Sequence, residues 1–248
     1  MAHPIDILMM RPEANQIGHW EECCLGQLAP ALARRYAQLA TPRRRLEWLC
    51  SRAMLLTGFK QLHAIGAPKL DVDATGRPVA ADGWHVSISH SHGLVVAAIA
   101  RLPIGIDVEW LHRRRAIRSM STLPAFSGSA AFRHPADTPQ GMAERLGAWT
   151  LAESVAKSAG VGLWQALECM AVLGPDRKGG PALRVDSRLP EGPWQVRMAR
   201  LAEDWQCAVA VRGRGKIAPP RVWRLLPKGT IRGPEAPDWL AIPVRQRA

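Results

Sequence analysis

Three carboxylates and a lysine have the spacing of a cation-binding site. Asp107 and Glu109 are two residues apart in an apolar run, so on a β-strand both side chains lie on the same face. Glu153 follows Trp149 by four residues and precedes Lys157 by four, which places all three on one face of a helix. Carboxylates that converge repel one another unless a cation lies between them. Because no histidine or cysteine cluster accompanies them, the set predicts a site for a hard, oxygen-binding ion such as Mg²⁺.

A phosphate-binding segment is predicted upstream of these acids. Ser89-His90-Ser91 follows a strand-like run directly, and hydroxyl, imidazole and backbone N–H groups at a strand end can bind phosphate oxygens. Arg77, just after the turn residue Gly76, can add a positive charge. Together with the acids, these residues predict a site for a metal ion and a diphosphate.

Each of these features also has a purely structural interpretation. Glu153 and Lys157 can be a solvated ion pair one helical turn apart. Asp107 and Glu109 can be the exposed face of an edge strand, and His90 can cap a turn. Only the combination of the features, in this order along the chain, favours a functional site.

That ordered combination resembles the 4'-phosphopantetheinyl transferases, in particular the long, monomeric type that activates surfactin synthetase. The family signature consists of Gly-x-Pro, a strand ending in Asn-x-Ser-His-Ser, then Gly-x-Asp-x-Glu and, further along, Trp-x-x-Lys-Glu-x-x-x-Lys. The matching segments here are Gly76–Pro78, Ser87–Ser91, Gly105–Glu109 and Trp149–Lys157. The resemblance covers about residues 44 to 165 and leaves out the Pro/Arg-rich tail.

The resemblance implies transfer of the 4'-phosphopantetheine arm of coenzyme A to a serine of an apo carrier protein, with release of 3',5'-ADP. It implies that Asp107, Glu109 and Glu153 hold Mg²⁺ on the diphosphate and that Glu153 also accepts the serine proton. With Glu153, the expected catalytic residues are Lys157, which would neutralise the departing phosphate, and His90. The expected coenzyme A ligands are Lys157, His90 with Ser89 at the diphosphate, Arg77 at the nucleotide and Arg45 at the 3'-phosphate.

The net charge of +12 fits an acidic partner. Acyl, peptidyl and aryl carrier proteins are acidic, so the resemblance implies that a carrier docks on the segment from Arg113 to Phe132, steered by charge. The same charge and the Arg-rich tail are also compatible with a nucleic-acid-binding protein. Three converging carboxylates would repel phosphates in the absence of metal, however, which disfavours nucleic acid as a partner.

Two positions depart from the family pattern. Ala152 stands where lysine is usual, and Ser87 stands where asparagine is usual. Loss of one charge-assisted hydrogen bond to the transferred phosphate would cost about 1.5–3 kcal/mol. We expect retained activity because the three acids are complete; the alternative is a degenerate relative that binds coenzyme A with weak or no turnover.

The remaining pattern predicts the elements that position these residues. Thr41 and Pro42 begin a helix that runs to about His63, with Arg44, Arg45 and Arg52 off its buried stripe. A second long helix is expected at Ala143–Ala159, an interrupted one at Trp20–Leu39, and strands at Pro4–Met10, Cys169–Leu173, Leu183–Val185, Trp194–Leu201 and Trp205–Val211. Three further runs are expected to form one antiparallel meander: Trp84–Ile88, Leu94–Ala100 and Ile104–Glu109.

These elements predict an α+β fold of two similar halves. The resemblance implies the transferase fold, in which the halves have a pseudo-twofold arrangement and each has a small antiparallel sheet packed on a long helix. The expected parts are an N-terminal half (1–111), a flap or linker (112–142), a C-terminal half (143–212) and an extended, partly ordered tail (213–248). The sequence shows no membrane-spanning run and no secretory signal, so we expect a cytoplasmic monomer. Five cysteines without a Cys-x-x-Cys pair argue against a disulfide framework or a zinc site.

Overall fold

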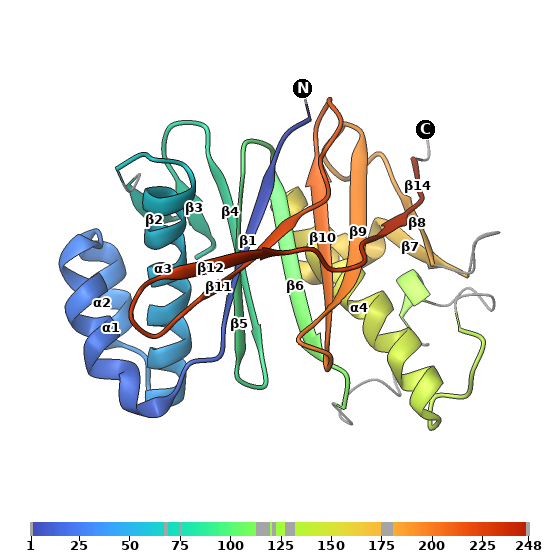
Figure 1. Ribbon diagram of the computed structural model, residues 1–248. Helices are drawn as coiled ribbons and strands as arrows, with labels where there is room; N and C mark the ends of the chain where they lie inside the picture. Colours follow the sequence, from blue (N-terminus) through green and yellow to red (C-terminus); the bar gives the residue numbers. More distant parts are fainter. Residues whose placement is uncertain are drawn as a thin grey trace. The chain divides into compact units, whose positions relative to one another are not determined.

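The computed structural model describes residues 2–66, 69–74, 76–112, 120, 123–126, 132–174 and 181–246. The chain forms two compact units: unit 1 consists of Met1–Leu102 and Ile217–Ala236, and unit 2 of Pro103–Lys216 and Pro237–Ala248. Each unit is mixed α+β, with a sheet packed on one long helix (Figure 1), which confirms the expected fold class. The pseudo-twofold relation of the halves stays a prediction. No helix within the described ranges combines the length and apolar character that crossing a membrane requires.

The main sheet of unit 1 has the strand order β12-β11-β1-β5-β4. Its strands are β1 (Ile5–Met10), β4 (His85–Ser91), β5 (Leu94–Ala100), β11 (Arg221–Leu225) and β12 (Ile231–Glu235). Two short strands, β2 (Leu70–Val72) and β3 (Pro78–Ala80), form a separate antiparallel pair. We expected an antiparallel sheet, but this sheet is mixed, because β1 pairs antiparallel with β5 and parallel with β11.

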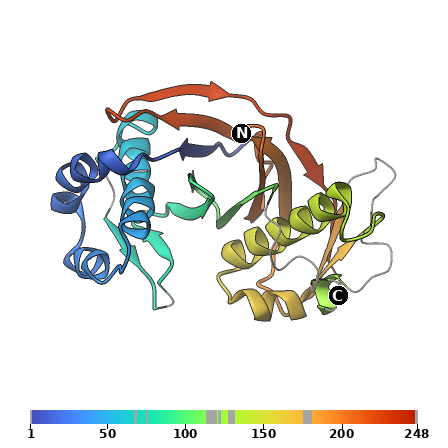
Figure 2. The same cartoon turned by 90° about the horizontal axis from the view of Figure 1, so that it is seen from below.

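The long helix of unit 1, α3 (Pro42–Leu62), begins where the sequence predicts it. The Thr41 hydroxyl accepts a hydrogen bond from the Arg44 backbone N–H at 3.3 Å, and His63 is the C-cap. The sheet covers one side of α3, and α1 (Ile17–Cys24) and α2 (Pro30–Ala37) cover the other (Figure 2). Because α3 is covered on both sides, Arg52 is buried, at 8 % exposure, and the prediction that it lies off the buried stripe is wrong.

The main sheet of unit 2 has the order β13-β9-β10-β6, and a smaller sheet has the order β14-β8-β7. The strands are β6 (Ile104–Trp110), β7 (Met170–Leu173), β8 (Ala182–Val185), β9 (Trp194–Leu201), β10 (Trp205–Arg212), β13 (Leu240–Ile242) and β14 (Val244–Gln246). The predicted three-strand meander is therefore wrong in its last member. β4 and β5 form a hairpin, but β6 pairs antiparallel with β10, from Ile104 opposite Val211 to Trp110 opposite Trp205.

The long helix of unit 2, α4, spans Pro139–Ala159 and begins earlier than the predicted Ala143. The Thr138 hydroxyl accepts the Gly141 backbone N–H at 3.0 Å, so a Thr-Pro pair starts this helix as it starts α3. The helix ends at Gly160, whose φ of 79° is left-handed. The shorter elements are α5 (Leu163–Glu168) and the 3₁₀ helices η1 (Ala14–Gln16), η2 (Leu25–Gln27) and η4 (Pro124–Phe126). Much of the expected flap, residues 113–119, 121–122 and 127–131, lies outside the described residues.

The Pro/Arg-rich tail is not a separate extended segment. Its strands β11 and β12 belong to the sheet of unit 1, and β13 and β14 belong to the sheets of unit 2. The buried Asp6 carboxylate, 0 % exposed, explains part of this order because it accepts two hydrogen bonds from Arg221, each 2.8 Å long, and one from Trp223 at 2.7 Å. The units also change at Leu102/Pro103 rather than at residue 111, because β6 belongs to the second sheet.

Candidate active site

The acidic pair Asp107 and Glu109 lies on the face of β6 that α4 covers. The two side chains point to the same side of the strand and are buried, with exposures of 5 % and 8 %. Their partners across the ladder on β10 are Ala208 and Gln206. The sequence prediction of two carboxylates on one strand face is therefore confirmed.

Gly105 explains how α4 comes close enough to reach this pair. It lies on the same face of β6 as the two acids, and a Cβ atom there would collide with the Ser154 backbone oxygen. The same atom would lie 2.5 Å from the Ser158 backbone nitrogen and 2.9 Å from Lys157 Cβ. The glycine of the Gly-x-Asp-x-Glu segment is thus required for the helix to pack directly on the strand.

Lys157 joins the helix to the strand at the acidic pair. Its Nζ donates to Asp107 Oδ1 at 2.7 Å and to the Ile106 carbonyl oxygen at 3.1 Å. The lysine side chain is 26 % exposed and that of Asp107 is 7 % exposed, so the ion pair is largely screened from water. The two residues predicted to belong to one site are therefore in direct contact.

Glu153 lies one helical turn before Lys157, and its pKa reports how close the other charges are. Burial raises the pKa of Glu153, and the negative charges of Asp107 and Glu109 raise it further, whereas the positive charge of Lys157 lowers it. The charges of the strand pair therefore act on the helix acid. Their convergence on one bound cation stays a prediction.

The three carboxylates do not form a finished metal centre. Within the described part of the chain, no group of three or more His, Cys, Asp or Glu side chains is arranged to hold a metal ion. The donor chemistry nevertheless fits a hard divalent cation, because two buried carboxylates raise the pKa of a third and a cation would offset that repulsion. Mg²⁺ binding by Asp107, Glu109 and Glu153 stays a prediction that this electrostatic arrangement favours.

A half-exposed stripe on α4 carries the functional side chains. Between Gly147 and Ala159 every residue of α4 is buried except Trp149, Glu153 and Lys157, the three predicted to share a face. Ala152 is 0 % exposed and belongs to the apolar core of unit 2. A lysine at this position, as in the family pattern, would have to extend its ammonium group out of that core.

In unit 1 the Ser-His-Ser segment forms the end of β4, and its side chains alternate between two faces. Ser89 and Ser91 are buried, at 7 % exposure each, whereas the His90 side chain is 54 % exposed. His90 Nδ1 lies 3.4 Å from Glu47 Oε2. Of His90 and Ser89, only His90 has a largely exposed side chain. Their joint binding of one diphosphate stays a prediction.

The two predicted arginine ligands are both held by local contacts. Arg77 Nε and Nη2 donate to Asp73 Oδ2 at 2.9 and 2.6 Å, across a turn in which Gly76 has a φ of 83°. Arg45 Nε donates to the Leu39 carbonyl oxygen at 2.9 Å. Their roles toward the nucleotide and the 3'-phosphate stay predictions.

Two further cations, which the sequence analysis missed, lie near these residues. The guanidinium group of Arg35 occupies the space that a side chain at Gly76 would need. Burial lowers the pKa of Arg52 to about 9, and the positive charge of Arg35 lowers it further. Arg52 has no carboxylate within ion-pair distance among the residues that the structure describes, so the charges of this region favour an anion. Arg35 lies in α2, and no sequence pattern reveals that it approaches the Gly76 turn.

The comparisons with known proteins agree with this arrangement. Residues 32–100 match the 4'-phosphopantetheinyl transferase N-terminal domain, and residues 103–210 match the 4'-phosphopantetheinyl transferase superfamily. The first match ends at residue 100 and the second begins at residue 103. The boundary between the matches therefore lies at the sequence boundary between unit 1 and unit 2, Leu102 and Pro103. No curated protein matches the chain significantly. With both domain matches and an α+β fold that carries the acidic strand pair, the helix acid and the lysine, the chain belongs to the 4'-phosphopantetheinyl transferase superfamily.

Proposed function

We propose that this transferase moves the 4'-phosphopantetheine arm of coenzyme A to a serine hydroxyl of an acidic apo carrier protein and uses Mg²⁺ as its cofactor. One observation carries the proposal: Lys157, one helical turn after Glu153 on α4, contacts Asp107 on β6 directly. Family membership supports phosphopantetheinyl transfer in general. The expected monomeric state and cytoplasmic location stay predictions.

The reaction requires that a serine oxygen attack the phosphorus that bears the pantetheine group. The new bond joins that oxygen to phosphorus, the bond from phosphorus to the bridging oxygen breaks, and 3',5'-ADP leaves with the bonding electrons. The serine proton must go to a base, and Glu153 is the candidate on the half-exposed stripe of α4. A carboxylate in this position can act as the general base that takes this proton.

Lys157 can neutralise the charge that develops on the leaving phosphate. Its ammonium group is already fixed over β6 by Asp107 and Ile106, so little reorganisation is needed for it to meet an incoming phosphate oxygen. Asp107, Glu109 and Glu153 would hold Mg²⁺, which when bound supplies positive charge to the diphosphate oxygens. The cations of unit 1 near the Gly76 turn, Arg35, Arg52 and Arg77, support binding of the phosphate groups of coenzyme A.

The test is intact-protein mass spectrometry of several apo carrier proteins incubated with the chain, coenzyme A and Mg²⁺. We expect a mass gain of one phosphopantetheine group, abolished by chelation of the metal and by Glu153→Gln. Glu168→Gln is the matched control, because Glu168 is an exposed acid on the neighbouring helix α5. Carriers left unmodified by the wild-type chain would contradict the proposal, and coenzyme A binding without transfer would identify a degenerate relative.

A further inference from the structure

We infer that Glu47 positions His90 for contact with a phosphate group of the substrate, a role that rests on the proposed function. Glu47 lies in the second turn of α3, and its side chain is only 7 % exposed. Its Oε2 atom lies 3.4 Å from Nδ1 of His90 at the end of β4. A helix residue that no motif includes therefore contacts the exposed histidine of the Ser-His-Ser segment.

The surroundings of Glu47 make its ion partners necessary. The carboxylate borders a cavity of about 330 Å³ whose wall is mostly apolar. Ile17 and Leu46 are among the apolar residues that line it, and Arg43 borders it beside Glu47. A buried carboxylate in such surroundings is costly unless its oxygens are paired. Here Oε1 accepts from Arg43 Nε at 3.0 Å, and Oε2 faces His90.

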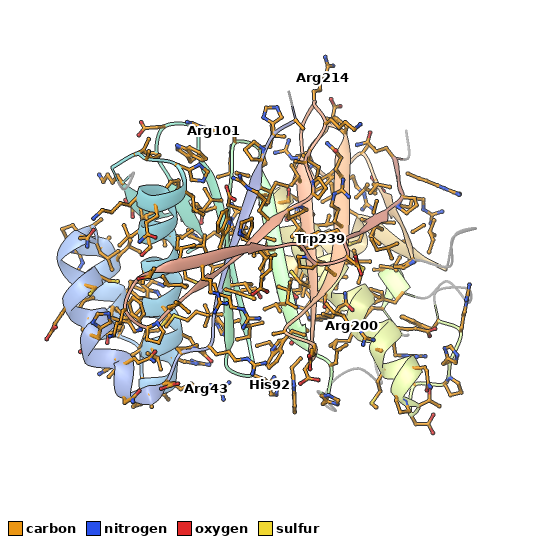
Figure 3. The ribbon with its side chains drawn as sticks, in the orientation of Figure 1. Arg43, His92, Arg101, Arg200, Arg214 and Trp239 are labelled. Carbon is orange, nitrogen blue, oxygen red and sulfur yellow. The ribbon has the colours of Figure 1, made fainter. Side chains whose placement is uncertain are left out.

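The two partners of Glu47 come from different elements. Arg43 belongs to the first turn of α3 and its side chain is 68 % exposed, whereas His90 belongs to β4. Arg43 and His92 lie at the same end of unit 1, where α3 begins and the β4–β5 hairpin turns (Figure 3). Glu47 therefore ties the start of the helix to the end of the strand that carries His90.

The contact determines which nitrogen of the His90 ring remains for a ligand. With Nδ1 toward Glu47, Nε2 lies on the opposite edge of a side chain that is 54 % exposed. A phosphate oxygen is an acceptor, so the ring would donate to it from Nε2 while Nδ1 faces the Glu47 carboxylate. Glu47 thus sets the orientation of the ring.

The experiment compares two substitutions of Glu47 of graded severity. Glu47→Gln keeps an acceptor for His90 and removes the charge, whereas Glu47→Met removes both and suits the apolar cavity wall. We expect the KM for coenzyme A to rise about threefold and about tenfold, respectively, because a misoriented His90 loses part or all of its hydrogen bond to the phosphate, with kcat within about twofold of wild type. Glu235→Met is the matched control, because Glu235 pairs with Arg224 on the exposed tail strands of the same unit.

A double-substitution cycle separates positioning from stability. If Glu47 acts through His90, then His90→Gln raises the KM, and adding Glu47→Met to it changes the KM no further. Imidazole nitrogen shifts of His90, measured by long-range proton–nitrogen NMR and assigned with His90→Gln, should move in Glu47→Met. Melting temperatures of the variants should stay close to that of wild type.

Each alternative outcome has a distinct meaning. Independent effects of the two substitutions on KM, or unchanged His90 nitrogen shifts in Glu47→Met, would overturn the role of Glu47. A wild-type chain that modifies no carrier would instead overturn the proposed transfer. In that case the same cycle is measured on the dissociation constant of coenzyme A by calorimetry, and independent effects there would again overturn the role of Glu47.

Discussion

Lys157 Nζ on α4 lies 2.7 Å from Asp107 Oδ1 on β6, a contact between residues 50 positions apart in the sequence. Both side chains are mostly shielded from solvent, so loss of either partner would leave the other charge buried and unpaired in unit 2. The contact also fixes the lysine beside the acids that we propose hold the metal. This ion pair therefore connects α4 to β6 at the predicted metal site.

Replacing Lys157 should slow the transfer and also destabilise unit 2, because Asp107 would lose its ion partner while it stays buried. Lys157→Met removes the ammonium group, and loss of one charge-assisted hydrogen bond of about 1.5–3 kcal/mol corresponds to a fall in kcat of about one to two decades. Lys157→Arg keeps the charge, so its kcat should lie between that of wild type and that of Lys157→Met. Initial rates of carrier modification at saturating coenzyme A measure the effect; an unchanged kcat in Lys157→Met would contradict it.

Gly105→Ala should destabilise unit 2, because the added Cβ would collide with the backbone of α4. Overpacking of this kind costs about 1–3 kcal/mol, and more where backbone must move. Gly18→Ala is the control, since a Cβ at Gly18 meets nothing within 4 Å on helix α1. That substitution should be neutral or stabilising. Urea denaturation gives the free energy of unfolding of both variants. Equal values would show that α4 can shift away from β6 at no cost.

Glu153→Gln should make the protein more stable at neutral and alkaline pH while it abolishes transfer. Burial and the charges of Asp107 and Glu109 raise the pKa of Glu153, so its contribution is intact below the unfolded pKa and is lost as the pH rises through the folded pKa. Glutamine does not titrate and escapes this loss. Thermal melts should show the variant's advantage at pH 8 and none at about pH 4 or below, the ordinary range of a glutamate. A variant less stable at every pH would contradict the electrostatic interpretation.

Arg221→Met should destabilise unit 1 strongly, because Arg221 donates twice to the fully buried Asp6. Removing one partner of a buried pair costs about 3–5 kcal/mol. Arg224→Met, on the same strand, breaks only an exposed pair with Glu235 and should cost less than about 1 kcal/mol. Chemical denaturation of the two variants gives the comparison directly; similar losses would mean that Asp6 finds other partners.

Mild acid should weaken unit 1 through His63. Burial lowers the pKa of His63 below its ordinary value of 6.5, and the charges of Arg221 and Arg101 lower it further, although Asp6 opposes them. The unfolded chain therefore binds the proton more readily, so stability is complete above pH 6.5 and falls as the pH drops below it. The free energy of unfolding of His63→Gln should fall less than that of wild type between pH 7 and pH 5. Parallel curves for the two proteins would rule out His63 as the source.

Local spacing predicted how the candidate residues of unit 2 are placed on their helix and strand. The Thr41-Pro42 start, the two-residue spacing of Asp107 and Glu109 and the four-residue spacing of Glu153 and Lys157 are short-range features, which the fold preserves. These short-range patterns do not indicate which strands pair with each other when they are far apart in the sequence. Nothing within β6 indicates that it pairs with β10 rather than β5, because a strand partner is set by packing over long sequence distances.

Composition also misled in two places. A run rich in proline and arginine predicts loose chain, yet the buried carboxylate of Asp6 orders it through Arg221 and Trp223. Arg52 fits the polar side of a helix by its type, but α3 is covered on both faces and buries it. The position of Arg35 beside Gly76 comes from the tertiary fold, and no spacing in the sequence indicates it.

The parallel pairing of β1 with β11 affects how the chain is made. β1 is synthesised long before its partner, Arg221–Leu225. Until that partner has been made, one edge of the nascent sheet of unit 1 stays open, and such edges recruit other chains. A chain interrupted before residue 221 would therefore expose a strand edge that favours aggregation.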